Sequence, residues 1–172
     1  MDKSIISNLN FSPMTRKEAE TISTWQYPAP YDLYSMDGSE ETINEFINYD
    51  YYMVKNEDGN LIGYVCFGEA ARVPGGYEIA LYNDEIPVDI GLGIHPDLTG
   101  KRYGTAFLTS ALTFLKELKA PPEARLVVTT FNKRAIRLYE KVGFKRGDHF
   151  FSPVGNHNVE FVSMRCPLLS FK

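Results

Sequence analysis

The chain has 172 residues, of which 44% are hydrophobic, so it can bury one sizeable core but is short for two separate domains. Its 18 lysines and arginines and 22 acidic residues give a formal net charge of −4, which excludes a global attraction to nucleic acid or to an anionic membrane. The opening residues lack the apolar core of a signal peptide, and no run approaches the roughly 18 apolar residues of a membrane helix. We therefore expect a single cytoplasmic domain over residues 1–172.

The first third of the chain predicts short helices, an irregular segment and a hairpin. Thr15 and Glu18 match the T-x-x-E capping box and predict a helix that runs towards Trp25. Prolines and a glycine interrupt regular structure in residues 26–38, where aromatic and acidic side chains gather. Asp58-Gly59 is a strong hairpin signal between two apolar runs. The other elements expected here are a strand near residues 11–14, a helix over 39–48 and paired strands within 51–68.

The remainder of the chain predicts alternating strands and helices. VPGG, residues 73–76, predicts a break. Apolar side chains on alternate residues then predict a strand with one face in the core: Val88, Ile90, Leu92 and Ile94. Helical periodicity over residues 103–118 ends at a pair of prolines. The elements expected after it are a strand over 125–130, a helix opened by Asn132 and closing strands within 145–166. Without an internal repeat or a linker, this pattern predicts one mixed α/β unit.

Neither the cysteines nor the histidines form a metal-binding pattern. Cys66 and Cys166 lie in apolar runs without C-x-x-C spacing, which predicts free, buried thiols. No two of the three histidines have ligand spacing on one element. We therefore assign no metal.

The turn within DIGLGIHPDLTGKRYGTAFL, residues 89–108, leads from a strand into a helix. Residues 100–104 would offer unpaired backbone N–H groups, the positive end of a helix dipole and the cations of Lys101 and Arg102. Glycine would let phosphate oxygens approach the backbone. The spacing matches neither a P-loop nor a dinucleotide fingerprint. The turn therefore predicts an anion site, with an ordinary turn and solvated cations as the alternative.

A second motif, FNKRAIRLYEKVGFK, covers residues 131–145 and predicts a helix with defined ends. Asn132 is placed to cap it, and Gly143 suits its left-handed end. Tyr139 follows Asn132 by seven residues, two helical turns, so both lie on one side. Tyr139 either presents its phenol there or packs its ring in the core.

These motifs together resemble the GNAT superfamily of acetyl-CoA-dependent N-acetyltransferases. The resemblance is strong over residues 88–144, through IHPD, TGKRYGTAF and N-x-x-A-x-x-L-Y-x-x-x-G-F. It implies a central, mostly antiparallel sheet that is splayed at the cofactor site and flanked by about four helices. The family's phosphate loop reads R/Q-x-x-G-x-G/A, and Thr99, Arg102 and Gly104 occupy those positions, so Thr99 and Arg102 depart from the pattern.

The resemblance also implies the site residues. Strand backbone at Leu92 and Ile94 would bind the pantetheine arm of acetyl-CoA, with room for acetyl at Gly91 and Gly93. Tyr139 would be the general acid that protonates the leaving thiolate. The residues expected to bind the cofactor are Leu92, Gly93, Ile94, Thr99, Gly100, Lys101, Arg102, Tyr103, Gly104, Thr105, Asn132 and Ala135.

The base and the acceptor follow from less specific signals. Asp89 alternates to the side of Gly91 and Gly93 and is the first candidate for the general base, with Glu78 second. The acceptor is expected to be a primary amine of a small molecule or peptide, read by the aromatic and acidic residues of the irregular segment or, alternatively, covered by them as a lid. The residues expected there are Trp25, Tyr27, Tyr31 and Asp32. A homodimer is possible, and a catalytically idle acyl-CoA sensor or assembly module stays open as the alternative function.

Overall fold

The computed structural model describes residues 3–169, and contacts between residues divide the chain into two compact units. The first comprises Met1–Ala70 and Leu92–Ser110, and the second comprises Ala71–Gly91 and Ala111–Lys172. Strand β4 (Pro87–Ile94) starts in the second unit and ends in the first, whereas helix α4 (Gly104–Lys119) starts in the first and ends in the second. That residues 1–172 form a single domain is still a prediction.

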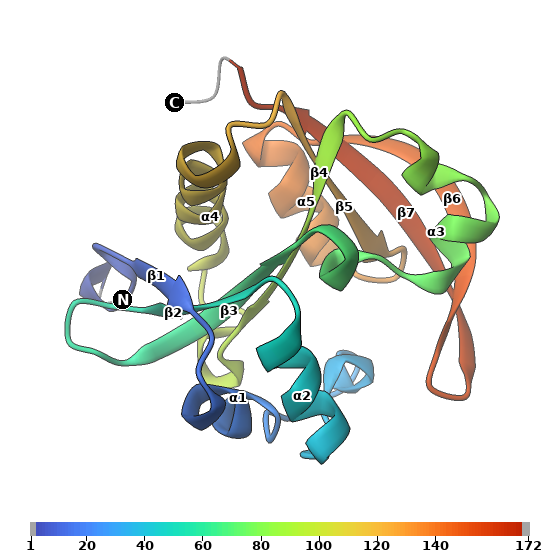
Figure 1. Cartoon of the computed structure of the whole chain (residues 1–172). Helices are drawn as coiled ribbons and strands as arrows, with labels where there is room; N and C mark the ends of the chain where they lie inside the picture. Colours follow the sequence, from blue (N-terminus) through green and yellow to red (C-terminus); the bar gives the residue numbers. More distant parts are fainter. Residues whose placement is uncertain (1–2, 170–172) are drawn as a thin grey trace. The chain divides into compact units, whose positions relative to one another are not determined.

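The first unit contains an antiparallel sheet of β1 (Asn10–Pro13), β2 (Tyr51–Lys55) and β3 (Leu61–Phe67). The predicted β2–β3 hairpin is confirmed (Figure 1), and Gly59 takes the left-handed φ of 82° at its turn. Asn56 is buried and holds the turn, because its Oδ1 accepts hydrogen bonds from the N–H groups of Asp58 at 3.1 Å and Asn60 at 3.0 Å. Side-chain hydrogen bonds of this kind replace the backbone hydrogen bonds between β2 and β3 where the two strands end.

Helices α1 (Arg16–Ile22) and α2 (Glu40–Asn48) contact each other in the first unit. The Ser39 side chain caps α2 by accepting from the N–H of Thr42 at 3.1 Å. The predicted capping box of α1 is wrong in its bonding, because Thr15 makes no side-chain bond to the helix backbone. Its hydroxyl donates to Glu18, which also accepts from Lys55 Nζ at 2.8 Å. Glu18 therefore ties α1 to β2 instead of completing a reciprocal cap.

The second unit contains the first part of β4 with β5 (Glu123–Thr129), β6 (Lys145–Val154) and β7 (His157–Pro167). β4 pairs with β5 in parallel from Pro87–Glu123 to Asp89–Arg125, whereas β7 pairs antiparallel with both β5 and β6. Figure 1 shows β6 and β7 as a long hairpin. Hydrogen bonds connect the seven strands in the order β1-β2-β3-β4-β5-β7-β6, which confirms a mixed, mostly antiparallel sheet.

The described residues contain five α-helices rather than about four, because the break expected at VPGG is a helix. Helix α3 (Pro74–Glu78) starts with proline in its first turn, where the missing N–H costs nothing. Its two glycines allow neighbouring groups to pack closely against the helix. A Cβ on Gly75 would lie 2.0 Å from the carbonyl oxygen of Phe151, and a Cβ on Gly76 would lie 2.5 Å from the Tyr82 ring. The glycines that predict a break in the sequence are therefore required for close packing of a helix.

The predicted inward face of β4 is only partly confirmed. Ile90 is buried, but Val88, Leu92 and Ile94 are half-buried, and Asp89 on the other face is buried too. The helix predicted over residues 103–118 is confirmed as α4, with Phe107 and Leu115 in the cores. Both cysteines are free and buried, as expected.

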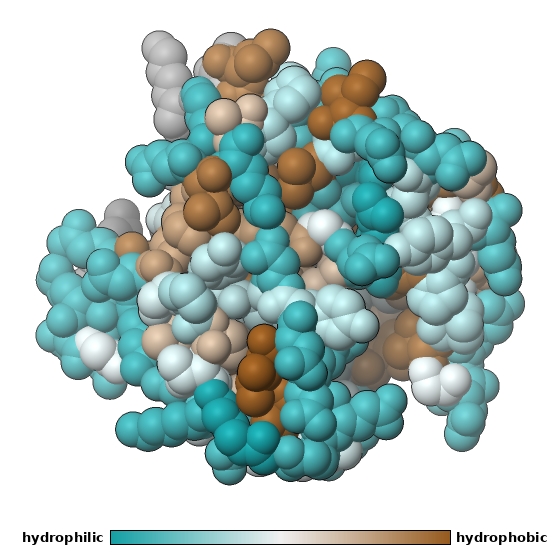
Figure 2. Space-filling view, viewed as in Figure 1, coloured by the Kyte–Doolittle hydropathy of each residue, from teal (hydrophilic) through white to brown (hydrophobic). Residues whose placement is uncertain are grey.

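Hydrophilic residues cover most of the face seen in Figure 2, with separate hydrophobic patches between them. Within residues 3–169, no helix has the length and apolar character required to cross a bilayer.

Candidate functional site

The predicted anion turn of the first unit precedes α4 and contains two left-handed residues. Gly100 has a φ of 72° and Arg102 a φ of 66°. Left-handed residues within a turn direct successive N–H groups towards one concavity, a common way to bind an anion. The first N–H groups of α4 add donors, because they have no partner within the helix. A turn of this kind offers several backbone donors to an anion.

The side chains of this turn differ in what they offer. Lys101 and Arg102 are exposed and, within the described part of the chain, neither forms an ion pair. The Thr99 hydroxyl donates to the carbonyl of Pro96 at 2.8 Å. Tyr103 is 4% exposed, so its ring belongs to the core. Gly104 and Thr105 begin α4 and are half-buried.

The end of β4 offers backbone groups in the first unit. The N–H of His95 donates to the carbonyl of Ile62 on β3 at 2.8 Å. Because peptide groups alternate along a strand, those of Leu92 and Ile94 point away from β3. The Ile94 carbonyl accepts a hydrogen bond from the Tyr27 hydroxyl at 2.8 Å. A carbonyl oxygen has two lone pairs, so the Ile94 carbonyl can still accept a second hydrogen bond.

The room expected at Gly93 for an acetyl group is filled by protein. A Cβ on Gly93 would lie 2.3 Å from Cε1 of Tyr64. The Tyr64 ring packs edge-on against Phe46, with ring centroids 5.3 Å apart, and burial raises the pKa of Tyr64 well above 10. The expectation of space at Gly93 is therefore wrong, because the missing side chain accommodates an aromatic ring.

The four residues predicted for the acceptor lie in different environments of the first unit. Trp25 is 5% exposed, and its ring centroid lies 5.0 Å from that of His95. Tyr27 is half-buried, and burial raises its pKa to about 12. Tyr31 is half-buried, whereas Asp32 is exposed at the start of the 3-10 turn η2 (Asp32–Tyr34). The carboxylate of Asp32 thus meets solvent, while Trp25 packs in the core as the lid interpretation expects.

Helix α5 (Lys133–Val142) of the second unit has the ends that the sequence predicts. The Asn132 side chain accepts from the N–H of Ala135 at 3.2 Å, and Gly143 closes the helix with a φ of 126°. Tyr139 is half-buried, with its ring centroid 5.9 Å from that of Phe144. Its ring therefore packs on the residue that follows the helix, and part of the side chain is accessible.

The placement of Asp89 in the second unit argues against its predicted role as general base. Its side chain is 3% exposed, and its carboxylate accepts from Nε of Arg125 at 2.6 Å, from Nη2 of Arg125 at 3.0 Å and from Nε of Arg72 at 2.9 Å. Nη1 of Arg125 donates to the carbonyls of Leu81 and Asp84. Both carboxylate oxygens are thus engaged by arginines, and the side chain is almost entirely shielded from solvent. Glu78, the second candidate, is exposed at the end of α3.

Sequence reasoning missed the two arginines of this cluster. Arg125 is fully buried and Arg72 partly so, and both guanidinium groups lie over the Tyr82 ring, 5.1 and 4.7 Å from its centroid. The sequence signal that could have revealed the cluster is Arg125, a charged residue at the start of the apolar run LVV. It marks a structural ion pair between β4 and β5.

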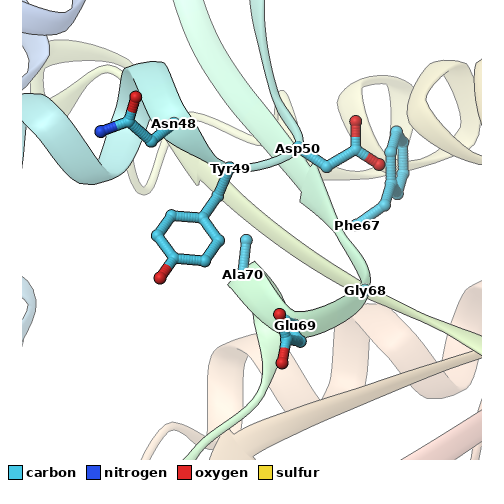
Figure 3. A pocket seen from close by; sticks show the side chains of 7 residues that line it. All are labelled: Asn48, Tyr49, Asp50, Phe67, Gly68, Glu69 and Ala70. Atoms are coloured by element: carbon cyan, nitrogen blue, oxygen red, sulfur yellow. The ribbon is translucent and has the colours of Figure 1, made fainter.

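A cavity of about 520 Å³ lies in the first unit. None of the residues that line it was predicted to bind the cofactor or the acceptor or to take part in catalysis. It is formed where α2 runs into β2 and where β3 ends, and Figure 3 shows the carboxylates of Asp50 and Glu69 among its side chains. The residues lining it are Asn48, Tyr49, Asp50, Phe67, Gly68, Glu69 and Ala70.

Comparison with known proteins supports the resemblance seen in the sequence. The model of the acetyltransferase (GNAT) family matches residues 18–144. No curated protein matches the sequence. A GNAT-family acetyltransferase from Bacillus anthracis superposes with a TM-score of 0.70 at 17% identity, over 94% of this chain and 95% of that one. A variant of the spermidine N-acetyltransferase SpeG from Vibrio cholerae does so with a TM-score of 0.70 at 18% identity, over 96% of each chain.

These findings define the class of protein. The family model covers most of the chain, and the solved structures share its mixed fold. The chain therefore belongs to the GNAT acetyltransferase family, a family of acyltransferases.

Proposed function

We propose that this protein transfers an acetyl group from acetyl-CoA to a primary amine of a small molecule or peptide. The observation that carries the proposal is the turn before α4, where left-handed Gly100 and Arg102, helix N–H groups and two exposed cations suit a phosphate in a chain of this family. Acetyl-CoA would supply a thioester, which is an activated acyl donor.

The cofactor would be held mainly by backbone groups. N–H groups of residues 100–105 would bind phosphate oxygens, assisted by Lys101 and Arg102. Leu92, Gly93 and Ile94 would bind the pantetheine amides in the manner of a neighbouring strand, since the peptide groups of Leu92 and Ile94 point away from β3. Thr99, Tyr103 and Gly104 would shape the turn, and Asn132 and Ala135 would contribute at the start of α5.

Proton transfer would involve Tyr139. Direct attack by an amine on the thioester leaves a thiolate that needs a proton, and a positioned phenol can donate one. An acceptor amine has a pKa of about 10.4 and must lose its proton first. We propose that water takes this proton, because both oxygens of Asp89 are engaged by arginines.

The acceptor would be a cationic amine. Tyr27 and Tyr31 are half-buried and Asp32 is exposed in one segment, so aromatic faces and a carboxylate are close in sequence. Spermidine is the first acceptor to test, since a structure with the same fold is a spermidine N-acetyltransferase.

Calorimetric titration of the purified protein with acetyl-CoA tests the proposal first. Micromolar binding, followed by thiol release that spermidine or another amine accelerates, is the expected result. Binding without any accelerating amine would favour an acyl-CoA sensor instead. An absence of binding would refute acetyl transfer from CoA altogether.

A further inference from the structure

The chain from Trp25 to Met36, which contains the residues proposed to read the amine, forms a loop that is closed on itself and is named the acceptor loop below. The N–H of Met36 donates to the carbonyl of Trp25 at 3.1 Å, and the N–H of Tyr27 donates to the hydroxyl of Ser35 at 2.8 Å. These two hydrogen bonds join the beginning of the loop to its end. The loop therefore has a base, where its two ends meet, and a tip, residues 28–34, between them.

The base of the acceptor loop contacts two consecutive residues where β4 ends. The Tyr27 hydroxyl donates to the Ile94 carbonyl at 2.8 Å, and the Trp25 ring centroid lies 5.0 Å from that of His95. All four residues belong to the first unit. Burial raises the pKa of Tyr27 to about 12, so its phenol keeps its proton at a pH where an acceptor amine, with a pKa of about 10.4, has lost its own. A neutral donor and a packed ring thus fix the base of the loop to the end of β4.

The tip of the acceptor loop is more accessible than its base. Residues 28–30 are exposed, Tyr31 is half-buried and Asp32 is exposed, whereas Trp25 is 5% exposed. The four residues predicted for the acceptor therefore fall into two pairs. Trp25 and Tyr27 fix the loop, and Tyr31 and Asp32 lie in the part of the loop that an amine in solution can approach.

The Ile94 carbonyl is also a group that the proposed function assigns to the cofactor. It points away from β3, and a carbonyl oxygen can accept from two donors at once. An acetyl donor bound to this strand and an amine bound to the acceptor loop would thus be held by elements that a hydrogen bond joins. Two bound molecules react when their atoms lie within about 3–3.5 Å, and small displacements lower the rate steeply. The hydrogen bond from Tyr27 to Ile94 therefore bears on the separation of amine and thioester.

We infer that Tyr27 is a positioning residue, whose hydrogen bond to the Ile94 carbonyl holds the loop that reads the amine against the strand that holds the acetyl donor. The inference rests on the proposed function, because it requires acetyl-CoA on β4 and the amine on the acceptor loop. Tyr27 acts through the loop backbone and through Ile94, and its hydroxyl takes no part in the chemical step.

Two substitutions in the acceptor loop separate positioning from binding. Tyr27→Phe keeps the ring and removes the hydroxyl, so the loop loses its hydrogen bond to β4. Asp32→Asn removes the exposed carboxylate of the tip and leaves the base intact. Tyr49→Phe is the matched control, because Tyr49 lies in the same unit outside the loop and is 54% exposed.

Steady-state kinetics with spermidine, calorimetry with acetyl-CoA and thermal unfolding give the readouts. We expect Tyr27→Phe to lower kcat by about twofold to tenfold, to leave the Kd of acetyl-CoA unchanged and to lower Tm by no more than about 5 °C. Asp32→Asn should instead raise the KM for spermidine with little change in kcat, because it removes an interaction made equally before and during the reaction. Tyr49→Phe should match the wild type in all three.

Each contrary result has a distinct meaning. An unchanged kcat in Tyr27→Phe, or a rise in KM alone, would overturn the positioning role. Tighter binding of acetyl-CoA by Tyr27→Phe would also overturn it, since the hydroxyl would then compete with the cofactor for the Ile94 carbonyl. Weaker acetyl-CoA binding in parallel with the fall in kcat would reduce Tyr27 to a structural residue. Wild-type protein that binds no acetyl-CoA, or that no amine accelerates, would refute the proposed function instead, so the two failures are distinguishable.

Discussion

Asp89 and Arg125 form a buried, two-point ion pair at the last registered position of the parallel β4–β5 ladder. Removing one partner of such a pair leaves the other charge buried and uncompensated in the protein interior. We therefore expect Asp89→Asn to lower the free energy of unfolding by about 3–5 kcal/mol, as measured by urea denaturation.

Asp97→Asn is the control for this substitution. Its carboxylate is 86% exposed and lies 4.0 Å from His95, so the change should cost less than about 0.5 kcal/mol. An Asp89→Asn protein of wild-type stability that loses the acidic limb of its rate–pH profile would contradict the structural role and restore Asp89 as the base.

Tyr139→Phe tests the proposed acid. Loss of a positioned proton donor lowers rates by about 10²–10⁴, whereas affinity for acetyl-CoA should not change. Steady-state kinetics and calorimetry separate the two. Tyr77→Phe, at a tyrosine that is 51% exposed on α3, should leave both unchanged. Wild-type turnover in Tyr139→Phe would reject the role of the phenol.

Gly93→Ala tests the packing of Tyr64 on β4. The new methyl would lie 2.3 Å from the ring, so the strand or the ring must move, at a typical cost of about 1–3 kcal/mol. Tyr64→Leu in the same chain should recover part of this loss by vacating the space. Additive losses in the double variant would show that the ring does not fill the site of the missing side chain.

Asp37 should make stability depend on acidic pH. Hydrogen bonds from the N–H of Ser39 at 2.9 Å and from the Thr42 hydroxyl at 2.8 Å lower its pKa from 3.8 to about 2. The folded state thus binds this proton less readily than the unfolded chain, and the carboxylate stabilises the fold above pH 4. That contribution is lost as the pH falls from about 4 to 2.

Comparison of Asp37→Ala with wild type isolates this group. The variant should be less stable in urea at pH 6, and the difference should shrink between pH 4 and 2. A difference that stays constant over this range would show that the hydrogen bonds do not depend on the charge of Asp37.

The candidate site was predictable where it depends on local backbone geometry. The Asn132 cap, the Gly143 stop and the start of α4 all follow from interactions within a few residues, and the structure has them. The left-handed conformation of Arg102 was not predictable, because arginine has no preference for a positive φ and only the folded turn shows it.

The sequence by itself determined most of the helices and strands in their order, the hairpin at Gly59 and the family, because periodicity, caps and turn residues are local signals. The tertiary structure alone decided what three residues do. Asp89 meets Arg125 from a strand 36 residues away, Gly93 accommodates Tyr64, and Gly75 lets α3 approach β6. Such roles are set by which atoms become neighbours across the fold, and alternation along one strand carries no information about the partner that will fill or bind each position.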